Sequence, residues 1–104
     1  MKELTIENFD KTLNDNELVL IDWFSEVCFQ CEALRPKLEK LESKYSNIRF
    51  CSANVGNLSD IATRYGIMAL PTILLFKNNK VVHQFCGNLP QDVFEKELNK
   101  IWKR

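Results

Sequence analysis

Two of the four cysteines, Cys28 and Cys31, stand in a Cys-x-x-Cys arrangement. In a reducing compartment such a pair is typical of redox or metal chemistry rather than of a structural crosslink. If the first cysteine begins a helix, unpaired N–H groups and the helix dipole favour its thiolate. The pair then predicts dithiol–disulfide exchange. Cys28 attacks a partner disulfide, a mixed disulfide forms, and Cys31 releases it.

Two other roles fit a pair of cysteines. A zinc or iron–sulfur site normally takes a second pair of ligands at close spacing, whereas Cys51 and Cys86 are far apart in the sequence. The pair could also be buried and inert, although a helix start behind a buried strand is a poor place for inert thiols. The sequence favours redox exchange, and we expect no cofactor and no metal.

The pair lies between two segments with different periodicity. Residues 18–24 form an apolar run interrupted only by Asp22, which predicts a central strand buried on both faces. From Cys28 onward, apolar side chains recur at steps of three and four, as on one face of a long helix that contains Pro36. Further strands are predicted at 4–6, 48–55, 72–77 and 80–85, and further helices around Phe9 and Leu13, at 59–65 and from Pro90. This order predicts an α/β fold, with a mixed sheet and helices on both faces.

Length and composition narrow the possible functions. A chain of 104 residues predicts one domain over 1–104, and a monomer is the default at this size. The 14 basic and 14 acidic residues cancel, which argues against a nucleic-acid or anionic-membrane partner. No run approaches the roughly 18 apolar residues of a membrane span. The N-terminal residues lack the apolar stretch of a secretory signal, so we expect a cytoplasmic protein.

Several segments resemble the thioredoxin family. Residues 19–31 are similar to the family's active-site segment, and Pro36 matches the proline that follows the second cysteine by five residues. Residues 64–67 and 70–78 resemble the stretch around the family's cis-proline, and Cys86-Gly87 falls where the family has a glycine beside the active site. The match covers essentially the whole chain. It implies the thioredoxin fold, a central mixed five-stranded sheet flanked by four helices.

The resemblance also implies roles for single residues. Pro71 would be the cis-proline that presents the backbone of Leu70 to a substrate, although by itself it could simply start a strand. Asp22 would be a buried acid whose raised pKa suits proton transfer with Cys31, the alternative being an exposed acid at a strand end or bulge. The family's partners are protein disulfides and a thioredoxin-reductase-type electron donor. The residues implied to contact substrate are Val27, Phe29, Gln30, Ala69, Leu70, Pro71 and Gly87.

The sequence departs from the family pattern at four positions. Phe29 and Gln30 replace the usual Gly-Pro between the cysteines, and Val27 replaces the usual tryptophan before them. Ser52 falls where many members place a lysine near the buried acid, so we expect Asp22 to be harder to ionise. These changes bear on partner choice and redox potential but leave the exchange chemistry intact.

Three functions therefore remain open at this point. The first is a protein-disulfide reductase, and the second is a specialised carrier or disulfide isomerase with few partners. The third is a thioredoxin-fold binding module whose cysteines are incidental, which would keep its function when Cys28 is replaced by Ser. Cys86, beside Gly87, is expected to be an inert small apolar residue rather than a third redox site.

Overall fold

The computed structural model describes residues 1–102 and contains five strands and four helices. Their order confirms the α/β architecture expected from the sequence. In chain order the elements are β1 (Lys2–Glu3), α1 (Phe9–Asp15), β2 (Leu18–Phe24), α2 (Phe29–Lys44), β3 (Ile48–Asn54), α3 (Ser59–Arg64), β4 (Thr72–Lys77), β5 (Lys80–Cys86) and α4 (Gln91–Trp102).

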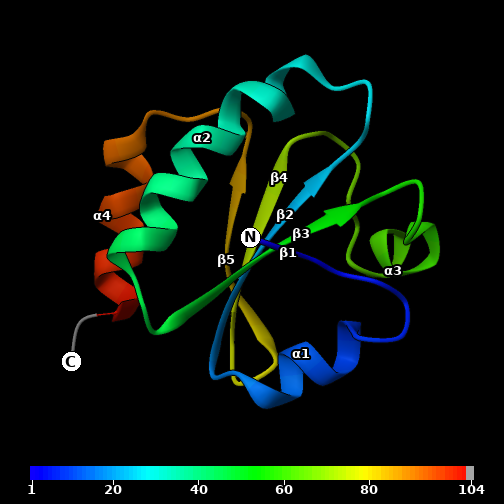
Figure 1. The fold of residues 1–104 in the computed structure, drawn as a ribbon, viewed down its shortest axis with the longest axis horizontal. Coiled ribbons are helices and arrows are strands. Elements are labelled where there is room, and N and C mark those ends of the chain that lie inside the picture. The colour runs from blue at the N-terminus through cyan, green and yellow to red at the C-terminus, as the bar shows by residue number, and fades with distance from the viewer. Residues whose placement is uncertain (103–104) are drawn as a thin grey trace.

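The strands form one mixed sheet in the order β1-β3-β2-β4-β5. β1, β3 and β2 run parallel, whereas β4 and β5 are antiparallel to their neighbours. β2 lies in the middle, and its residues pair with β3 on one side and with β4 on the other (Figure 1). This central place explains why residues 18–24 read as a nearly continuous apolar run.

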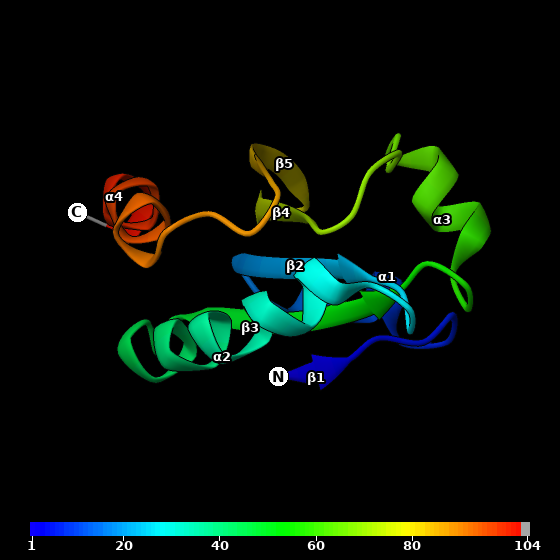
Figure 2. The ribbon, with the colours of Figure 1, turned by 90° about the horizontal axis from the view of Figure 1, so that it is seen from above.

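Helices cover both faces of the sheet and create two hydrophobic cores. α2 and α4 lie on one face and α1 and α3 on the other (Figures 1 and 2). Alternate residues of β2 point to opposite faces, as in any strand. Val19, Ile21 and Trp23 enter the core beneath α1 and α3, and Leu18 and Leu20 enter the core beneath α2 and α4.

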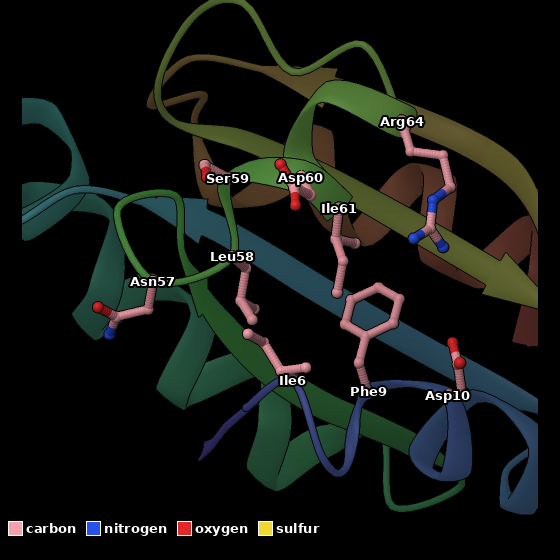
Figure 3. Close-up of a pocket in the computed structure, with 9 residues that line it drawn as sticks. All are labelled: Ile6, Phe9, Asp10, Asn57, Leu58, Ser59, Asp60, Ile61 and Arg64. Atoms are coloured by element: carbon pink, nitrogen blue, oxygen red, sulfur yellow. The ribbon is translucent and has the colours of Figure 1, made fainter.

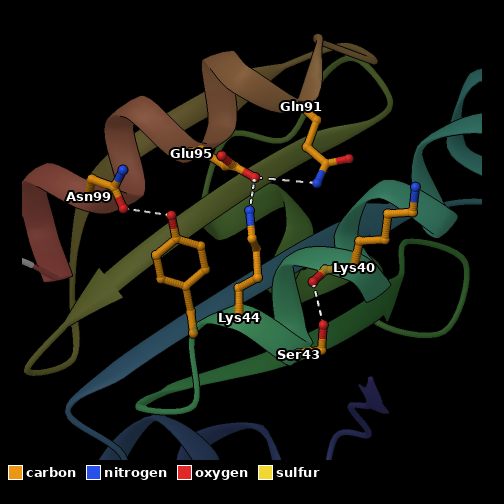
Figure 4. Close-up of polar contacts among 7 residues, drawn as sticks. Lys40, Ser43, Lys44, Gln91, Glu95 and Asn99 are labelled. Atoms are coloured by element: carbon orange, nitrogen blue, oxygen red, sulfur yellow. Dashed lines mark hydrogen bonds and ion pairs between the residues drawn. The ribbon is translucent and has the colours of Figure 1, made fainter.

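Polar contacts join the end of α2 to α4 at the surface of the second core (Figure 4). The Tyr45 hydroxyl donates a hydrogen bond of 2.6 Å to Asn99 Oδ1, and Lys44 Nζ lies 2.8 Å from Glu95 Oε2. Glu95 also accepts a bond of 3.4 Å from the Gln91 amide. The exposed ion pair contributes little to stability, so we attribute the docking of α4 mainly to burial of Phe94 and Leu98.

The predicted strand at 4–6 is wrong, because the first strand occupies Lys2–Glu3. Leu4 still donates a backbone hydrogen bond of 2.8 Å to the Ser52 carbonyl, but the chain then turns away from the sheet. The turn is held by reciprocal bonds, from Thr5 N–H to Asn8 Oδ1 (2.8 Å) and from Asn8 N–H to Thr5 Oγ1 (3.2 Å). Ile6, the last residue of the predicted strand, is 68% exposed.

Two turns have the backbone conformation that their residues favour. Asn78 and Asn79 both have positive φ, +52° and +68°, as a two-residue hairpin between β4 and β5 requires. Gly66 follows the C-cap residue Tyr65 of α3 and has φ +68°, the left-handed conformation that commonly ends a helix. The last helix begins one residue later than predicted, and the Pro90 carbonyl accepts hydrogen bonds from the N–H groups of Val93 and Phe94.

Within the described residues, no helix is both long and apolar enough to cross a membrane.

Packing of α2 against the sheet can be tested with two large apolar residues of equal size. Leu38 is fully buried, whereas Ile6 is 68% exposed. We expect Leu38→Ala to lower the free energy of unfolding by about 2–5 kcal/mol, because it leaves a cavity. Ile6→Ala should change it by no more than about 0.5 kcal/mol. Urea denaturation followed by circular dichroism measures the free energy of unfolding of both variants. Equal effects would show that Leu38 is not part of the core beneath α2 and α4.

Candidate active site

Cys28 and Cys31 form a disulfide at the beginning of α2, with their Cα atoms 5.2 Å apart. Cys28 is the N-cap residue: its backbone is extended (φ −125°, ψ 102°), and its Sγ accepts a hydrogen bond of 3.2 Å from the Cys31 N–H. The helix thus directs an unpaired N–H of its first turn at this sulfur. A thiolate there would accept the same bond more strongly, since charge-assisted hydrogen bonds are the stronger ones.

The two sulfurs differ in how far a partner can reach them. Cys31 is buried with 4% of its surface exposed, whereas Cys28 is only half-buried. Val27 and Phe29, on either side of Cys28, are 96% and 88% exposed, and Gln30 is exposed too. An incoming disulfide therefore meets Cys28 first, and Cys31 acts from inside the protein.

Pairing within the sheet brings the other predicted contact residues to the same edge. Trp23, near the end of β2, pairs with Thr72, the first residue of β4, and Thr72 pairs in turn with Cys86. Pro71 therefore lies beside the end of β2, from which the chain leads directly to Cys28. The Gly87 N–H donates a hydrogen bond of 2.8 Å to the Pro71 carbonyl.

The bond between Leu70 and Pro71 is cis, as the resemblance implied, and β4 begins at the next residue. Pro71 is buried, Leu70 is half-buried and Ala69 is exposed. The Ala69 carbonyl accepts a bond of 2.6 Å from the Thr72 hydroxyl, which ties the loop to the strand that follows.

Met68, in the loop that leads to Pro71, was not among the contact residues predicted from the sequence. It is 95% exposed and stands three residues before Pro71. Met68, Val27 and Phe29 are the most exposed of the large apolar side chains among the described residues. Exposed apolar groups near a reactive centre commonly mark a binding surface. A large apolar residue in the loop between Gly66 and Pro71 could have pointed to it.

Asp22 is completely buried in the middle of β2. It alternates with the residues that face α1 and α3, so its side chain lies on the α2 side of the sheet. Neither carboxyl oxygen has a hydrogen-bond partner. Burial raises the pKa of this carboxyl from 3.8 to about 6, and the charge of Arg35 opposes the rise. The alternative of an exposed acid at a strand end is wrong.

Arg35 supplies the positive charge that Ser52 does not. Ser52 is the buried partner of Asp22 on β3, where the family commonly has a lysine, whereas Arg35 belongs to α2. Its guanidinium carbon lies 5.0 Å from the centre of the Phe24 ring, a cation–π contact. Arg35 follows Cys31 by four residues and so shares its helix face, a spacing from which it could have been identified.

A cleft of about 130 Å³ opens beside the buried cysteine. Besides Cys31, Arg35 and Phe24, it is lined by Ser25, Glu26 and Glu32. The lining residues belong to the end of β2, the start of α2 and the connection between them. No group of three His, Cys, Asp or Glu side chains within residues 1–102 could hold a metal.

A second pocket, of about 260 Å³, lies between α1 and α3 and contains none of the predicted site residues (Figure 3). Its floor is apolar, and its rim carries Asp10, Asp60 and Arg64.

The other two cysteines are free. Cys51 is buried inside β3, where desolvation raises the pKa of its thiol, and Cys86 is exposed on β5. Neither free cysteine is paired with the other or with the pair at the start of α2.

A disulfide at a helix start, with one more accessible sulfur and a buried acid on the helix side of the sheet, is typical of a dithiol–disulfide exchange protein. The family model that matches the chain, over residues 1–100, is that of thioredoxin. The chain belongs to the thioredoxin family, and its activity is that of a thiol–disulfide oxidoreductase. Members of this family are reduced by thioredoxin reductase and act on protein disulfides.

Relatives and solved structures agree over almost the whole chain. Thioredoxin of Chlamydia caviae is 34% identical over 100 residues, which cover 96% of this chain and 97% of that protein. Thioredoxin-1 of Saccharomyces cerevisiae is 34% identical over 86 residues, covering 83% and 84%. A structure of Plasmodium falciparum thioredoxin superimposes with a TM-score of 0.89 at 27% identity, covering 96% of this chain and 98% of that one.

The buried carboxyl makes stability depend on pH. Because its pKa rises from 3.8 in the unfolded chain to about 6 in the folded protein, folding stability should fall as pH rises through this window. We expect Asp22→Asn to stabilise the oxidised protein by about 3 kcal/mol near pH 8 and by less than about 1 kcal/mol near pH 3. Urea denaturation at both pH values measures the difference.

A companion variant separates the charge of Arg35 from its packing. Arg35→Met should move the pH window of Asp22 upward, because the opposing positive charge is gone, whereas Arg35→Lys should leave it nearly unchanged. Arg64→Met, which removes an exposed charge on α3, is the matched control. A stabilisation by Asp22→Asn that is the same at both pH values would contradict the assignment.

Proposed function

We propose that this protein is a general dithiol reductant, which reduces disulfides of client proteins and is recharged by a thioredoxin-reductase-type electron donor. The observation that carries the proposal is the difference between the two sulfurs: Cys28 is accessible at the helix start, and Cys31 is buried behind it. This arrangement suits a nucleophile and a resolving thiol, in that order.

The reaction balances with the residues present. The Cys28 thiolate attacks one client sulfur, the client disulfide breaks, and the other client sulfur leaves with the electron pair and takes up a proton. Cys31 then gives its proton to Asp22 and attacks Cys28 Sγ. The bond between Cys28 and the client breaks, and the second client sulfur leaves with the electron pair and takes up the proton that Asp22 returns through solvent. The chain ends as the disulfide, and two electrons from the donor restore the dithiol.

Asp22 suits the role of proton acceptor because neither of its carboxyl oxygens is occupied by a hydrogen bond. An unpaired buried carboxyl with a pKa of about 6 holds its proton loosely at neutral pH and can exchange it with a nearby thiol. Arg35 keeps a useful share of the carboxyl ionised, since its charge lowers this pKa. We therefore assign Asp22 as a general base for the resolving step.

We further propose a docking surface at the edge of the sheet beside Cys28. Its apolar part is formed by Val27, Phe29 and Met68, which are exposed. A client segment in extended form would run along the backbone of Leu70 and Pro71, as in strand addition. Gln30, Ala69 and Gly87 complete the surface.

A specialised carrier or isomerase is the second candidate, and the exposure of Phe29 favours it. A phenylalanine that is 88% exposed between the two cysteines gives the site a bulky apolar contact of its own. Such a contact narrows the set of partners that reach Cys28. A non-catalytic binding module is the third candidate, and it needs neither an accessible sulfur nor a buried unpaired acid.

We propose the cytoplasm as the compartment and a monomer as the working form. The exposed thiol of Cys86 is unpaired, as thiols remain in a reducing compartment. One chain carries both cysteines, the acid and the docking surface, so a second copy is not required.

The midpoint potential of the Cys28–Cys31 couple tests the proposal. The protein is equilibrated in graded dithiothreitol buffers, and the free thiols are counted by alkylation and mass spectrometry. A midpoint below about −260 mV, more reducing than the glutathione pool, is expected for a general reductant. A midpoint near −200 mV or above would favour the specialised carrier or isomerase. Absence of a two-electron transition would leave only the binding module.

Serine variants should separate the two thiols. We expect Cys31→Ser to accumulate a mixed disulfide with a protein substrate, because the resolving thiol is missing, and Cys28→Ser to form none. Cys86→Ser is the control and should behave as the wild type. Non-reducing electrophoresis shows the adducts, and an adduct that forms through Cys31 in the Cys28→Ser variant would reverse the assignment.

A further inference from the structure

The connection between β5 and α4, residues 87–90, is fastened on two sides (Figure 1). On the sheet side, the Gly87 N–H donates to the Pro71 carbonyl at 2.8 Å. On the helix side, Lys37 Nζ donates to Asn88 Oδ1 at 2.9 Å and to the Leu89 carbonyl at 3.0 Å. The loop adds only one short backbone bond of its own, from Leu89 N–H to the Gly87 carbonyl at 3.1 Å.

Lys37 uses its charge in an unusual way for a helix lysine. Its side chain is half-buried, and it forms no ion pair with a carboxylate of residues 1–102. Both of its hydrogen bonds go to neutral oxygens of one loop, more than 50 residues away in sequence. Hydrogen bonds from a charged donor are the stronger kind, and here they join α2 to the loop that follows β5.

The position of Lys37 connects two halves of the site. It follows Cys31 by six residues on α2, the helix that begins at the cysteine pair. The loop that it holds contains Gly87, which in turn holds the carbonyl of Pro71. The short loop segment 87–89 is therefore hydrogen-bonded at one end to Pro71 and at the other to the helix that carries the cysteines.

We propose that Lys37 is a positioning residue for protein substrates, which sets the distance between the cysteine pair and the backbone edge at Pro71 by holding the loop 87–89 against α2. The inference rests on the proposed docking of an extended client segment along Leu70 and Pro71. A small disulfide needs only the Cys28 sulfur and not the edge. Lys37 therefore matters for protein disulfides and is dispensable for small ones.

The test compares two substrates in single turnover. Reduced protein is mixed with graded insulin, a protein disulfide, or with 5,5′-dithiobis(2-nitrobenzoic acid), a small one, and its oxidation is followed. We expect Lys37→Met to raise the half-saturating insulin concentration about fivefold with little change in the maximal rate. The rate with the small disulfide should stay within about twofold of the wild type.

Three further variants make the outcome specific. Lys37→Arg keeps a charged donor and should behave as the wild type, as should Lys40→Met, which removes an exposed lysine of the same helix. Lys37→Met should also speed hydrogen exchange of the Gly87 amide. Equal losses with both substrates, or no change with insulin, would overturn the inference.

Met68→Glu separates this inference from the docking proposal, because it places a charge on the exposed apolar surface without touching Lys37. If Met68→Glu weakens insulin binding and Lys37→Met does not, only the role of Lys37 is wrong. If neither variant weakens it, the docking surface is wrong and the role of Lys37 falls with it.

Discussion

The register of β2 between its two neighbours is the constraint on which the site depends. Side chains alternate along a strand, so a slip of one residue would turn Asp22 from the α2 face to the face of α1 and α3. It would also send Trp23, which is fully buried, to the opposite core. The same register pairs Trp23 with Thr72 and so brings Pro71 beside the segment that leads to Cys28. Asp22 and Pro71 are therefore placed by a single set of strand pairings.

This register also confines an energetically unfavourable group. A carboxyl without hydrogen-bond partners, buried in the central strand, costs stability whenever it is ionised. Burial of the neighbouring side chains, Leu20 and Ile21 on one side of Asp22 and Trp23 on the other, stabilises the fold and offsets this cost. The unfavourable acid is retained at the one face of the sheet that α2, and with it Cys31, covers. Stability and reactivity are thus opposed at this position, as they commonly are in active sites.

Local pattern was sufficient for much of the fold. The period of residues 18–24, the steps of three and four after Cys28, and the pair Asn78-Asn79 each specify a structure within a few neighbouring residues. The strand predicted at 4–6 was wrong because the reciprocal bonds between Thr5 and Asn8 outweigh a short apolar alternation. Turn chemistry of this kind decides an element only three residues long.

Some residues of the site could likewise be predicted from the sequence, and others could not. Cys28 and Cys31 are recognisable from spacing alone, whereas the family resemblance was needed to single out Asp22 and Pro71. The spacing of Arg35 places it on the helix face of Cys31, but its effect on the pKa of Asp22 could not be predicted, because that effect depends on how α2 lies over β2. Lys37 was equally hidden, since its partners at residues 88 and 89 come from the far end of the chain. Contacts between distant segments are decided by packing, which local patterns do not contain.

In this protein the positive charge near Asp22 comes from Arg35 on α2 rather than from a lysine on β3. The charge is therefore linked to the helix that carries the cysteines. A lysine on β3 would approach the acid from a neighbouring strand and would be independent of the helix that holds the cysteines. Arg35 stands one turn beyond Cys31 on α2 and contacts the Phe24 ring, so Cys31 and the charge that lowers the pKa of Asp22 belong to the same helix. Any partner that shifts the start of α2 on binding Cys28 then also shifts the field at Asp22. Because the carboxyl has no hydrogen bond to hold its charge, this field and the surrounding burial are the main determinants of its ionisation.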